Sequence, residues 1–328
     1  MTNCYLGIDA GGTSTRAAVV LADGTCAGVG RAGSGNPISA GPDHAAAQVL
    51  LATRRALEHA RLDPSNLVGG IAAMAGSRVA RRADWLNDPL HAAGIPVSLT
   101  LEPDLLAAFL SATAEPDGYA VVAGTGAVAV RVRGFELEAV TDGLGWLLGD
   151  AGSGFWIGQQ VVRAGLAALD GRAEPTALTP ALLAALDLDP DAPAEVEGRP
   201  GAVQHAVDLL YTWRPVELAR LAPLAFTAAA DGDPCAIAII RAAAKDLHAA
   251  LSAMVVPEIP GPLVFGGSVL AQQPTVAAIV AEALPGQEPL LTSDGLVGAA
   301  TLALRRGGVA VSPATFARLS ETVAAQRS

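Results

Sequence analysis

Two short segments rich in glycine and threonine have the composition of turns that bind phosphate groups. The first reads I-D-A-G-G-T-S-T, and its Gly11 and Gly12 let backbone N–H groups approach an anion closely. Thr13 and Thr15 add hydroxyl donors, and Asp9 can hold a hydrated Mg²⁺ because hard cations take oxygen ligands. A tight hairpin with a polar turn is the structural alternative for this segment taken alone.

The second segment, A-G-T-G-A, contains Gly124, Thr125 and Gly126. It occupies the equivalent place in the second half of the chain, at the first predicted hairpin of that half. We expect the two turns to face each other across a cleft between domains and to hold a triphosphate chain from both sides. The pair therefore indicates phosphate binding more strongly than either turn does alone.

A third segment, L-V-F-G-G-S-V, contains Gly266, Gly267 and Ser268. An apolar strand ends at the double glycine and a helix follows, so a flat ring such as adenine can lie against bare backbone at the helix N-terminus. An ordinary strand-to-helix turn is the alternative. The segment D-G-L-V-G-A-A, with Gly295 and Gly298, instead predicts a helix that packs closely on another backbone.

These segments lie between elements that predict two similar halves. Apolar periodicity and glycine turns predict, in the first half, three strands followed by a helix, a strand, a helix, a strand and a helix, at 4–9, 15–21, 25–30, 42–61, 67–74, 78–93, 95–101 and 105–114. The second half predicts three strands, a run of helices, then a strand, a helix, a strand and a helix, at 119–123, 127–132, 135–140, 154–256, 263–265, 274–283, 288–292 and 295–306. The expected fold class is α/β with a long-period duplication, and the second copy carries an insertion of several helices.

Composition narrows the function classes. With 328 residues, 51% of them hydrophobic, the chain can bury the cores of about two domains. A formal net charge of −11 disfavours nucleic acid as a partner. Lys245 is the only lysine, so the G-x-x-x-x-G-K-[ST] motif of P-loop enzymes is absent. Three cysteines, no uncharged apolar stretch of ~18 residues and no signal-peptide pattern predict a cytoplasmic protein that does not enter a membrane.

The D-A-G-G-T, G-T-G and F-G-G-S turns and the final G-A-A helix resemble the phosphate, adenosine and connecting motifs of the sugar kinase/Hsp70/actin ATPase superfamily. The segment D-G-L-G-W-L-L-G-D-A-G-S-G-F-W-I-G resembles the N-acetylglucosamine kinase and BadF/BadG/BcrA/BcrD ATPase family, and the resemblance covers about Tyr5 to Ala300. It implies two ribonuclease H-like (actin-like ATPase) domains, each with a mixed five-stranded sheet flanked by helices, and a cleft between them. The implied parts are residues 1–115, residues 116–306 with the helical insertion, and a C-terminal helix in 307–328 that packs back on the body.

The resemblance also implies ATP and Mg²⁺ as cofactors, a homodimer, and a catalytic carboxylate early in the helix after the fifth strand. The matching residue is Asp104 in L-E-P-D-L-L-A-A. A carboxylate beside a sugar hydroxyl accepts its proton as the O–P bond forms, and such general-base help is worth ~10²–10⁴-fold. A helix N-cap is the alternative for Asp104. Asp9 is expected to hold the Mg²⁺ through water.

Three further residues match sugar-contacting positions of the family. They are Asn36 in G-S-G-N-P, and Gly145 and Asp150 in G-L-G-W-L-L-G-D. The alternative for Asn36 is a turn residue before Pro37. The alternative for Asp150 is a cap of the helix predicted at 154–169.

Carboxylates indicate which sugar is bound. Glu102 lies two residues before Asp104, so on an extended segment both side chains point the same way. With Asp150 they make three carboxylates, which suit a protonated amine better than a neutral acetamido group. We therefore expect D-glucosamine to be phosphorylated at O6 to glucosamine 6-phosphate, and the overall pattern resembles actinobacterial glucosamine kinases. The chain departs from the G-G-W-G-H pattern of mammalian acetylglucosamine kinases, because Leu144 replaces the aromatic residue.

Two alternatives stay open. One is a kinase of N-acetylglucosamine or another hexose. The other is an ATPase that activates a dehydratase or reductase, a class in which thiolates of two subunits hold an iron–sulfur cluster. Cys4 and Cys26 are expected in adjacent strands and Cys235 at a helix start, which provides no paired thiolates at a dimer interface.

Overall fold

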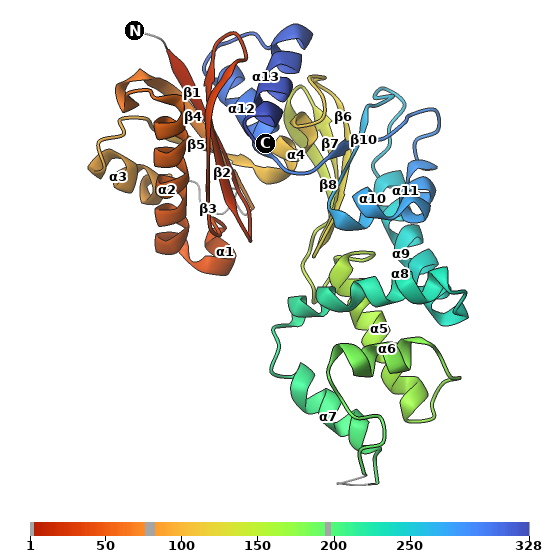
Figure 1. Cartoon of the computed structure of the whole chain (residues 1–328). Coiled ribbons are helices and arrows are strands. Elements are labelled where there is room, and N and C mark those ends of the chain that lie inside the picture. The colour runs from red at the N-terminus through yellow and green to blue at the C-terminus, as the bar shows by residue number, and fades with distance from the viewer. Residues whose placement is uncertain (1–2, 76–82, 194–197, 328) are drawn as a thin grey trace. The chain divides into compact units, whose positions relative to one another are not determined.

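The structure is a computed structural model that describes residues 3–75, 83–193 and 198–327 (Figure 1). It contains two five-stranded sheets, with the strand orders β3-β2-β1-β4-β5 and β10-β9-β6-β7-β8. Counted from its own first strand, each sheet has the same order: the first strand lies in the centre, the hairpin strands on one side and the two later strands on the other. The predicted α/β fold with a duplicated sheet is thereby confirmed.

The first sheet follows the prediction closely. Its strands are β1 (Cys4–Ala10), β2 (Thr15–Leu21), β3 (Cys26–Ala32), β4 (Leu67–Met74) and β5 (Leu99–Pro103). Strands β1, β2 and β3 pair antiparallel, while β4 pairs parallel with both β1 and β5. Strand β5 begins four residues later than expected. Ile95 and Val97 are buried as their apolar character indicates, but Pro96 between them has no N–H for a strand ladder.

Helices flank this sheet. They are α1 (Pro37–Ala40), α2 (Pro42–Ala60), α3 (Asp84–Ala92), α4 (Asp104–Leu110), α12 (Leu296–Arg306) and α13 (Pro313–Ala325), together with the short 3₁₀ helix η1 (Pro64–Asn66). Most of the helix predicted at 78–93 is seen as α3, and its first residues lie outside the described ranges. Helix α2 buries its apolar stripe, including Val49 and Ala52, against the sheet.

Helix α12 crosses β1 at very short range. A Cβ atom built on Gly7 would lie 2.5 Å from the backbone N of Ala300, and one built on Gly298 would overlap the carbonyl oxygen of Ala107. Only a residue without a side chain fits at either crossing point. The interpretation of the D-G-L-V-G-A-A segment as a packing motif is therefore confirmed.

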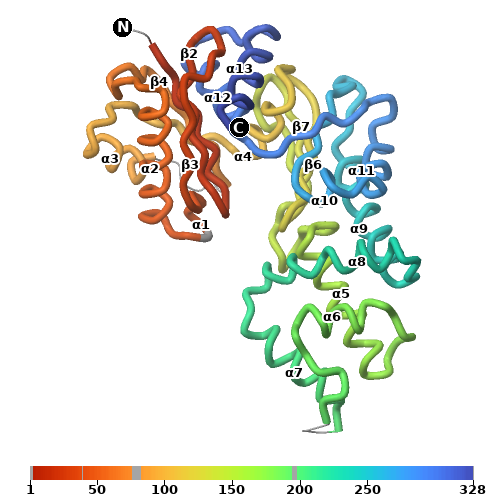
Figure 2. The backbone as a smooth tube through the Cα atoms, in the orientation of Figure 1, coloured from red at the N-terminus to blue at the C-terminus, as the bar shows by residue number. Residues whose placement is uncertain are grey.

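The second sheet is followed by the helical insertion. Its strands are β6 (Gly118–Ala123), β7 (Ala127–Arg133), β8 (Glu136–Asp142), β9 (Leu263–Gly266) and β10 (Leu290–Thr292). The remaining helices are α5 (Gly154–Leu169), α6 (Leu178–Ala185), α7 (Gly201–Leu210), η2 (Pro215–Leu221), α8 (Ala222–Ala230), α9 (Pro234–Ser252), α10 (Ser268–Gln272) and α11 (Pro274–Ala281). The run from α5 to α9 is the predicted insertion (Figure 2), and it has an apolar cluster of its own around Val162, Leu182 and Leu221.

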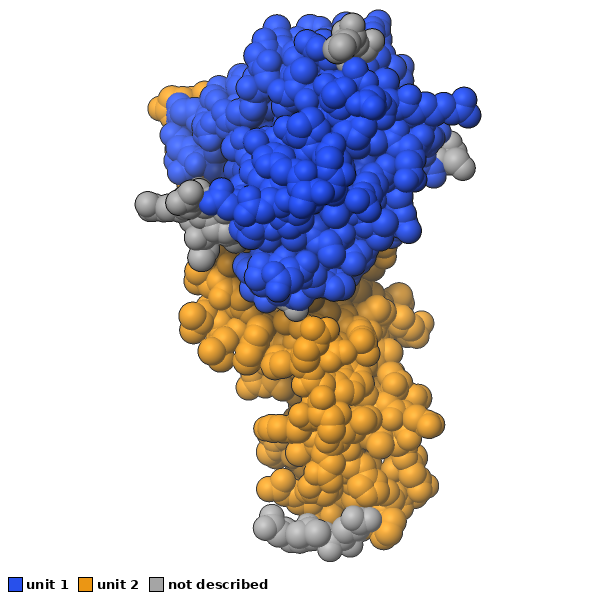
Figure 3. All heavy atoms as spheres, turned by 90° about the vertical axis from the view of Figure 1, so that its left-hand side faces the viewer, with its two compact units in different colours: residues 1–120, 131–138, 290–328 blue, residues 121–130, 139–289 orange. Residues whose placement is uncertain are grey.

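The chain divides into two compact units, coloured separately in Figure 3. Unit 1 comprises Met1–Ala120, Arg131–Glu138 and Leu290–Ser328, and unit 2 comprises Val121–Val130 and Ala139–Pro289. Helices α12 and α13 belong to unit 1 because α12 packs on β1 and α13 packs on β3 and α12. The domain boundaries expected at 115/116 and 306/307 were derived from the order of the strands, whereas the two units are defined by packing. Those domain boundaries stay a prediction.

Among the helices of the described residues, none alone has both the length and the apolar character needed to cross a membrane. One pair, Pro215–Ala230 and Pro234–Ser252, meets that criterion only when its two members are taken together, and the pair bends by 119° at the break.

The crossing of α12 over β1 can be tested by adding one methyl group. We expect Gly7→Ala to lower the free energy of unfolding by about 1–3 kcal/mol, because the added Cβ meets backbone atoms that cannot move aside. Gly69→Ala is the matched control, since a Cβ there lies 3.6 Å from its nearest neighbour, Cδ1 of Tyr5. Urea unfolding measures both. Equal stability of the two variants would contradict the close crossing.

Candidate active site

Asp9 lies at the end of β1 and is buried beside a cation. It stands opposite Arg16 in the β1–β2 hairpin, and Nη1 of Arg16 lies 3.3 Å from Oδ2 of Asp9. The backbone N–H of Gly295, at the start of α12, donates to the same oxygen at 3.1 Å. Nε of Arg16 lies 3.5 Å from Oδ2 of Asp294, whose Oδ1 accepts a hydrogen bond from Nη2 of Arg327 at 2.8 Å. The end of β1 therefore carries a network of alternating charges that runs from the buried Asp9 to the exposed Arg327.

The pKa of Asp9 is raised to about 6. Burial is the main cause and the charge of Asp294 adds to it, while Arg16 and the Gly295 N–H lower the pKa and Asp104 raises it slightly. A carboxylate in this condition binds a cation readily, because the cation replaces the proton and compensates the buried charge. The sequence did not single out Arg16, although the hairpin register places it opposite Asp9.

Asp104 is the first residue of α4, after the N-cap Pro103. Its Oδ1 accepts a hydrogen bond from the N–H of Leu105 at 3.0 Å. Burial raises the pKa of Asp104, and the backbone N–H groups of Leu105 and of Asp104 itself act against that rise. Because a general base works best with a pKa near the working pH, this shift suits the predicted role. The alternative as the N-cap is wrong, since Asp104 already lies inside the helix.

Glu102 occupies a different environment from the one expected. Strand β5 ends at Pro103 and α4 begins at Asp104, so Glu102 and Asp104 do not share an extended segment. Glu102 is 6% exposed, and its Oε1 lies 2.6 Å from Nε of Arg306 in α12. This ion pair neutralises the negative charge of Glu102, and that charge was the reason to expect Glu102 to contact the amine of the sugar.

The first glycine turn is tied to the segment that contains Asn36. The N–H of Gly35 donates to the carbonyl oxygen of Gly11 at 3.1 Å, and the Thr15 hydroxyl donates to the carbonyl oxygen of Gly33 at 2.8 Å. The hydroxyl proton of Thr15 is thus used inside the fold. Asn36 caps α1, because its Oδ1 accepts the N–H of Ile38 at 2.8 Å.

At the tip of this turn, Gly12 and Thr13 are exposed. The N–H of Gly11 is engaged by the carbonyl oxygen of Ser14 at 3.0 Å. The groups at the tip that remain at the surface to meet an anion are therefore those of Gly12 and Thr13.

In unit 2, the second glycine turn is packed against the start of α5. The N–H of Gly124 donates to the carbonyl oxygen of Gly126 at 2.9 Å, which closes the turn. The N–H groups of Gly154 and Phe155 donate to the carbonyl oxygens of Gly124 and Thr125, at 2.7 and 3.1 Å. The turn that the sequence predicts for phosphate is therefore held in place by backbone hydrogen bonds.

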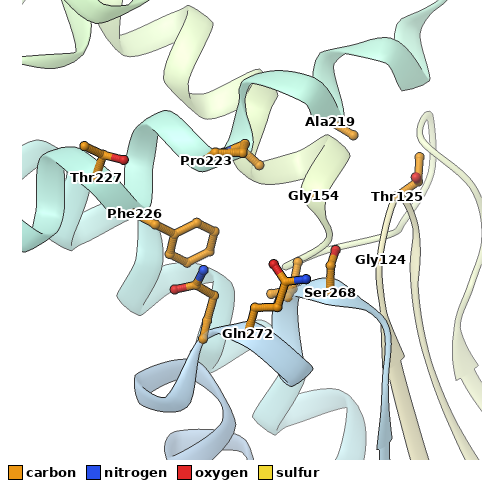
Figure 4. A pocket seen from close by; sticks show the side chains of 12 residues that line it. Gly124, Thr125, Gly154, Ala219, Pro223, Phe226, Thr227, Ser268 and Gln272 are labelled. Carbon is orange, nitrogen blue, oxygen red and sulfur yellow. The ribbon is translucent and has the colours of Figure 1, made fainter. Parts of the chain in front are cut away.

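The third segment lies beside this turn. A Cβ on Gly267, whose φ is +81°, would lie 2.7 Å from the backbone N of Gly124, so the chain between β9 and α10 can pass this turn only because the residue is glycine. Gly124, Thr125 and Ser268 line one cavity of about 310 Å³ (Figure 4). Gly266 and Gly267 do not line it themselves. The structure thus brings the second and third predicted segments together within unit 2.

The opposite wall of this cavity comes from the helical insertion and from α10. Phe226 of α8 and Gln272 of α10 extend toward it, and Thr227 and Gln273 also line it (Figure 4). An aromatic face with amide and hydroxyl groups nearby suits a flat heteroaromatic ring. These residues carry no glycine or motif signal, so local sequence patterns did not reveal them.

Asp150 lies against the second turn. A Cβ on Gly126 would lie 3.0 Å from Oδ2 of Asp150, and Oδ1 of Asp150 accepts the N–H of Ala127 at 3.3 Å. Burial raises the pKa of Asp150 and Asp142 adds to the rise, against hydrogen bonds from the N–H groups of Ala127 and Gly145. Ser153, not Asp150, caps α5, since its Oγ accepts the N–H of Trp156 at 3.1 Å. The alternative of Asp150 as the helix cap is wrong.

The loop of residues 143–149 is held by Asp142. Its Oδ1 accepts the N–H of Asp150 at 2.7 Å, and its Oδ2 accepts the N–H of Ala151 at 3.0 Å. Gly145 lies in this loop with a φ of +82°, and its carbonyl oxygen accepts the N–H groups of Leu148 and Gly149. The loop thereby fixes the backbone on either side of the two predicted sugar-contacting residues.

Metal chemistry is restricted by the available ligands. Within the described ranges, no group of three or more His, Cys, Asp or Glu side chains is arranged to hold a metal ion. Mg²⁺ keeps several waters and binds through one or two carboxylates together with substrate phosphates, so it does not need a group of three. Asp9 can supply such a carboxylate.

The cysteines are placed as structural thiols. Cys4 lies in β1 and Cys26 in β3, so the expectation of adjacent strands is wrong because β2 lies between them. Both are buried, and burial raises the pKa of Cys26 to about 11. Thiolates are the ligands of iron–sulfur clusters, so these two side chains are poor candidates for that role.

Comparison with known proteins supplies a family. The model of the BadF/BadG/BcrA/BcrD ATPase family matches residues 6–303. Among curated proteins, the chain is 28% identical to the glucosamine kinase GspK of Vibrio cholerae over 77% of this chain and 80% of that protein. It is 29% identical to the N-acetyl-D-glucosamine kinase of Dictyostelium discoideum over 92% of this chain and 97% of that protein.

Among solved structures, a proposed N-acetylglucosamine kinase from Chromobacterium violaceum matches with a TM-score of 0.70 and 26% identity. The match covers 92% of this chain and 99% of that one.

Because the pKa of Asp9 is raised in the folded chain, the free energy of unfolding is expected to depend on pH. Between the unfolded pKa of 3.8 and the folded pKa of about 6, the folded chain binds the extra proton, so stability falls as pH rises and stays lower above pH 6. The total loss is ~3 kcal/mol. We expect Asp9→Asn to remove this loss, so that its stability relative to the unsubstituted chain increases from pH 4 to pH 7. Urea unfolding at four pH values without Mg²⁺ measures the difference, and parallel pH profiles would disprove it.

Proposed function

The chain belongs to the BadF/BadG/BcrA/BcrD ATPase family, and we propose that it is an ATP-dependent kinase that phosphorylates D-glucosamine at O6. The observation that carries the proposal is the convergence of two sequence-predicted segments, Gly124–Thr125 and Ser268, on one cavity in a chain of this family. The similarity to a glucosamine kinase and to an N-acetylglucosamine kinase supports an amino sugar as the acceptor.

In the proposed reaction, the purine of ATP occupies the cavity beside Phe226, and the glycine turns bind the phosphates through backbone N–H groups. Asp9 would hold Mg²⁺ through water, and the ion would there supply positive charge to the transferring phosphoryl group. Asp104 accepts the proton of the O6 hydroxyl as the new O–P bond forms. Most of the rate enhancement comes from this positioning and charge compensation.

Charge supports glucosamine over its acetylated form. Asp150 and Asp142 are neighbouring carboxylates, and the charge of Asp142 adds to the rise that burial causes in the pKa of Asp150. A protonated amine would compensate this negative charge, whereas a neutral acetamido group would not. Glu102 no longer supports this preference, because Arg306 already pairs with it. The homodimer and the cytoplasmic location stay predictions.

One assay tests the reaction, its base and its substrate together. ADP release is measured with glucosamine, N-acetylglucosamine and glucose. We expect the highest kcat/KM for glucosamine, and we expect Asp150→Asn to lower kcat/KM about tenfold for glucosamine but little for N-acetylglucosamine. We expect Asp104→Asn to lower kcat by ~10²–10⁴-fold while the Kd for ATP stays within twofold.

Three outcomes of this assay contradict the proposal at different points. If N-acetylglucosamine is the better substrate, the charge argument is wrong. If Asp104→Asn turns over normally, Asp104 is not the base. If none of the three sugars stimulates ADP release, the kinase proposal itself fails.

The glycine turns allow a test that separates ligand contact from folding. A Cβ on Gly12 meets no atom within 4 Å, and one on Gly124 meets none nearer than 3.9 Å, so both alanine variants should fold normally. We expect each variant to raise the KM for ATP about tenfold, because the methyl group occupies the space of a phosphate oxygen. Gly69→Ala is the control with room for a methyl group away from the turns, and an unchanged KM in both turn variants would argue against phosphate binding there.

A further inference from the structure

A second cavity lies wholly within unit 1 and is lined by arginines. It has a volume of about 410 Å³, within the usual range of small-molecule sites, and its walls come from β2, β3, the start of α12 and the end of α13. We propose that this cavity is a regulatory site for a phosphorylated sugar, the class of molecule that the proposed reaction forms. The identity of the ligand rests on the proposed function, whereas the existence of the anion site does not.

The charge of the lining favours an anion. Arg16, Arg31 and Arg327 carry three positive charges against the single carboxylate of Asp294, although the chain as a whole has a net charge of −11. Within the described ranges, the Arg31 guanidinium has no carboxylate partner, and it is exposed. Guanidinium groups bind phosphate through two parallel hydrogen bonds, so a cluster of three is suited to a phosphate ester.

The lining also contains a buried acceptor that lacks a hydrogen-bond donor among the described residues. Oε1 of Gln326 is buried without a hydrogen-bond partner in the described chain, while its Nε2 donates to the carbonyl oxygen of Cys26 at 3.5 Å. An unpaired buried acceptor is costly, and a hydroxyl group can supply the missing donor. A sugar phosphate brings an anion for the arginines and hydroxyl groups at a distance from it, whereas inorganic phosphate has only the O–H groups of the anion itself.

The same arginines connect the cavity to the candidate active site. Arg16 lies 3.3 Å from Asp9 and 3.5 Å from Asp294, and Arg327 lies 2.8 Å from Asp294. A phosphate in the cavity competes with both carboxylates for these two guanidinium groups. Binding therefore breaks the ion pair that holds the carboxylate of Asp9, the residue proposed to hold Mg²⁺, in position, and it does so without occupying the sugar site. The expected effect is inhibition by product that is not competitive with the sugar.

Binding is measured by calorimetry on the full chain without nucleotide, using glucosamine 6-phosphate, inorganic phosphate and glucosamine as separate probes. We expect glucosamine 6-phosphate to bind most tightly, and we expect Arg31→Ala and Arg327→Ala each to weaken it at least tenfold. Arg54→Ala, which removes an exposed arginine of α2 outside the cavity, is the matched control and should bind as the unsubstituted chain does.

Kinetics supply the second measurement. In the absence of product, Arg31→Ala should keep kcat and both KM values within twofold, because in the described part of the chain Arg31 makes no ion pair with the carboxylates near Asp9. Inhibition by added glucosamine 6-phosphate should be non-competitive with glucosamine in the unsubstituted chain and should be lost in both variants.

Unchanged binding in both arginine variants would overturn the site. Inorganic phosphate binding as tightly as glucosamine 6-phosphate would overturn the sugar-phosphate assignment, and inhibition competitive with glucosamine that persists in the variants would place the product in the active site instead. If no sugar stimulates ADP release but arginine-dependent binding is still observed, the proposed function fails and the anion site stands.

Discussion

The backbone-to-backbone packing of α12 on β1 is the constraint on which the candidate active site depends. Gly7 lets the helix lie directly on the strand, and Gly298 lets it lie on α4. With the helix at that distance, the N–H of Gly295 reaches Asp9, and Asp294 reaches Arg16. A helix held farther away by even one methyl group at the crossing could not make these contacts with the same geometry. The chemistry at the end of β1 is therefore set by a steric condition in the middle of it.

In unit 2, close backbone contacts at glycines shape a cavity. The turn at Gly124 is contacted by the start of α5 and by the residue that precedes α10, and in each case a glycine makes the approach possible. The result is a cavity bounded on one side by bare backbone and on the other by side chains of inserted helices. The backbone hydrogen bonds hold the turn in one conformation, so this side of the cavity is formed before any ligand arrives. Substitutions in the inserted helices can then alter the opposite wall of the cavity without disturbing the turn.

The sequence predicted the local features of the molecule well. Hairpins with glycine turns and short buried strands have strong patterns, and β1, β2, β4 and β6 to β9 lie where those patterns indicate. At residues 95–98 the apolar content predicted a strand that the structure does not have. Ile95 and Val97 can be buried without belonging to a strand, because Pro96 interrupts the hydrogen-bond ladder. The duplication of strand order was also readable, because each half repeats the same succession of elements.

Long-range charge pairs could not be predicted in this way. Glu102 and Arg306 are 204 residues apart, and nothing near either residue indicates the other. The same holds for Asp294, whose segment reads as a packing motif, and for Phe226 and Gln272, which belong to helices without a motif. Ser153 rather than Asp150 caps α5 because of the local backbone path. Residue types indicated which groups can do chemistry, and only the fold determined which of them remain free to do it.

The contact between Gly295 and Asp9 joins residues 286 positions apart in the chain. During synthesis at ~5–20 residues per second, β1 therefore waits roughly 15–60 s after leaving the ribosome before the helix that covers it exists. Throughout that interval one apolar face of the first sheet is open to water, to other nascent chains and to chaperones. All five strands of the first sheet are made by residue 103, but the helix that covers this face follows only at Leu296–Arg306, so a chain that stops before α12 leaves the face exposed.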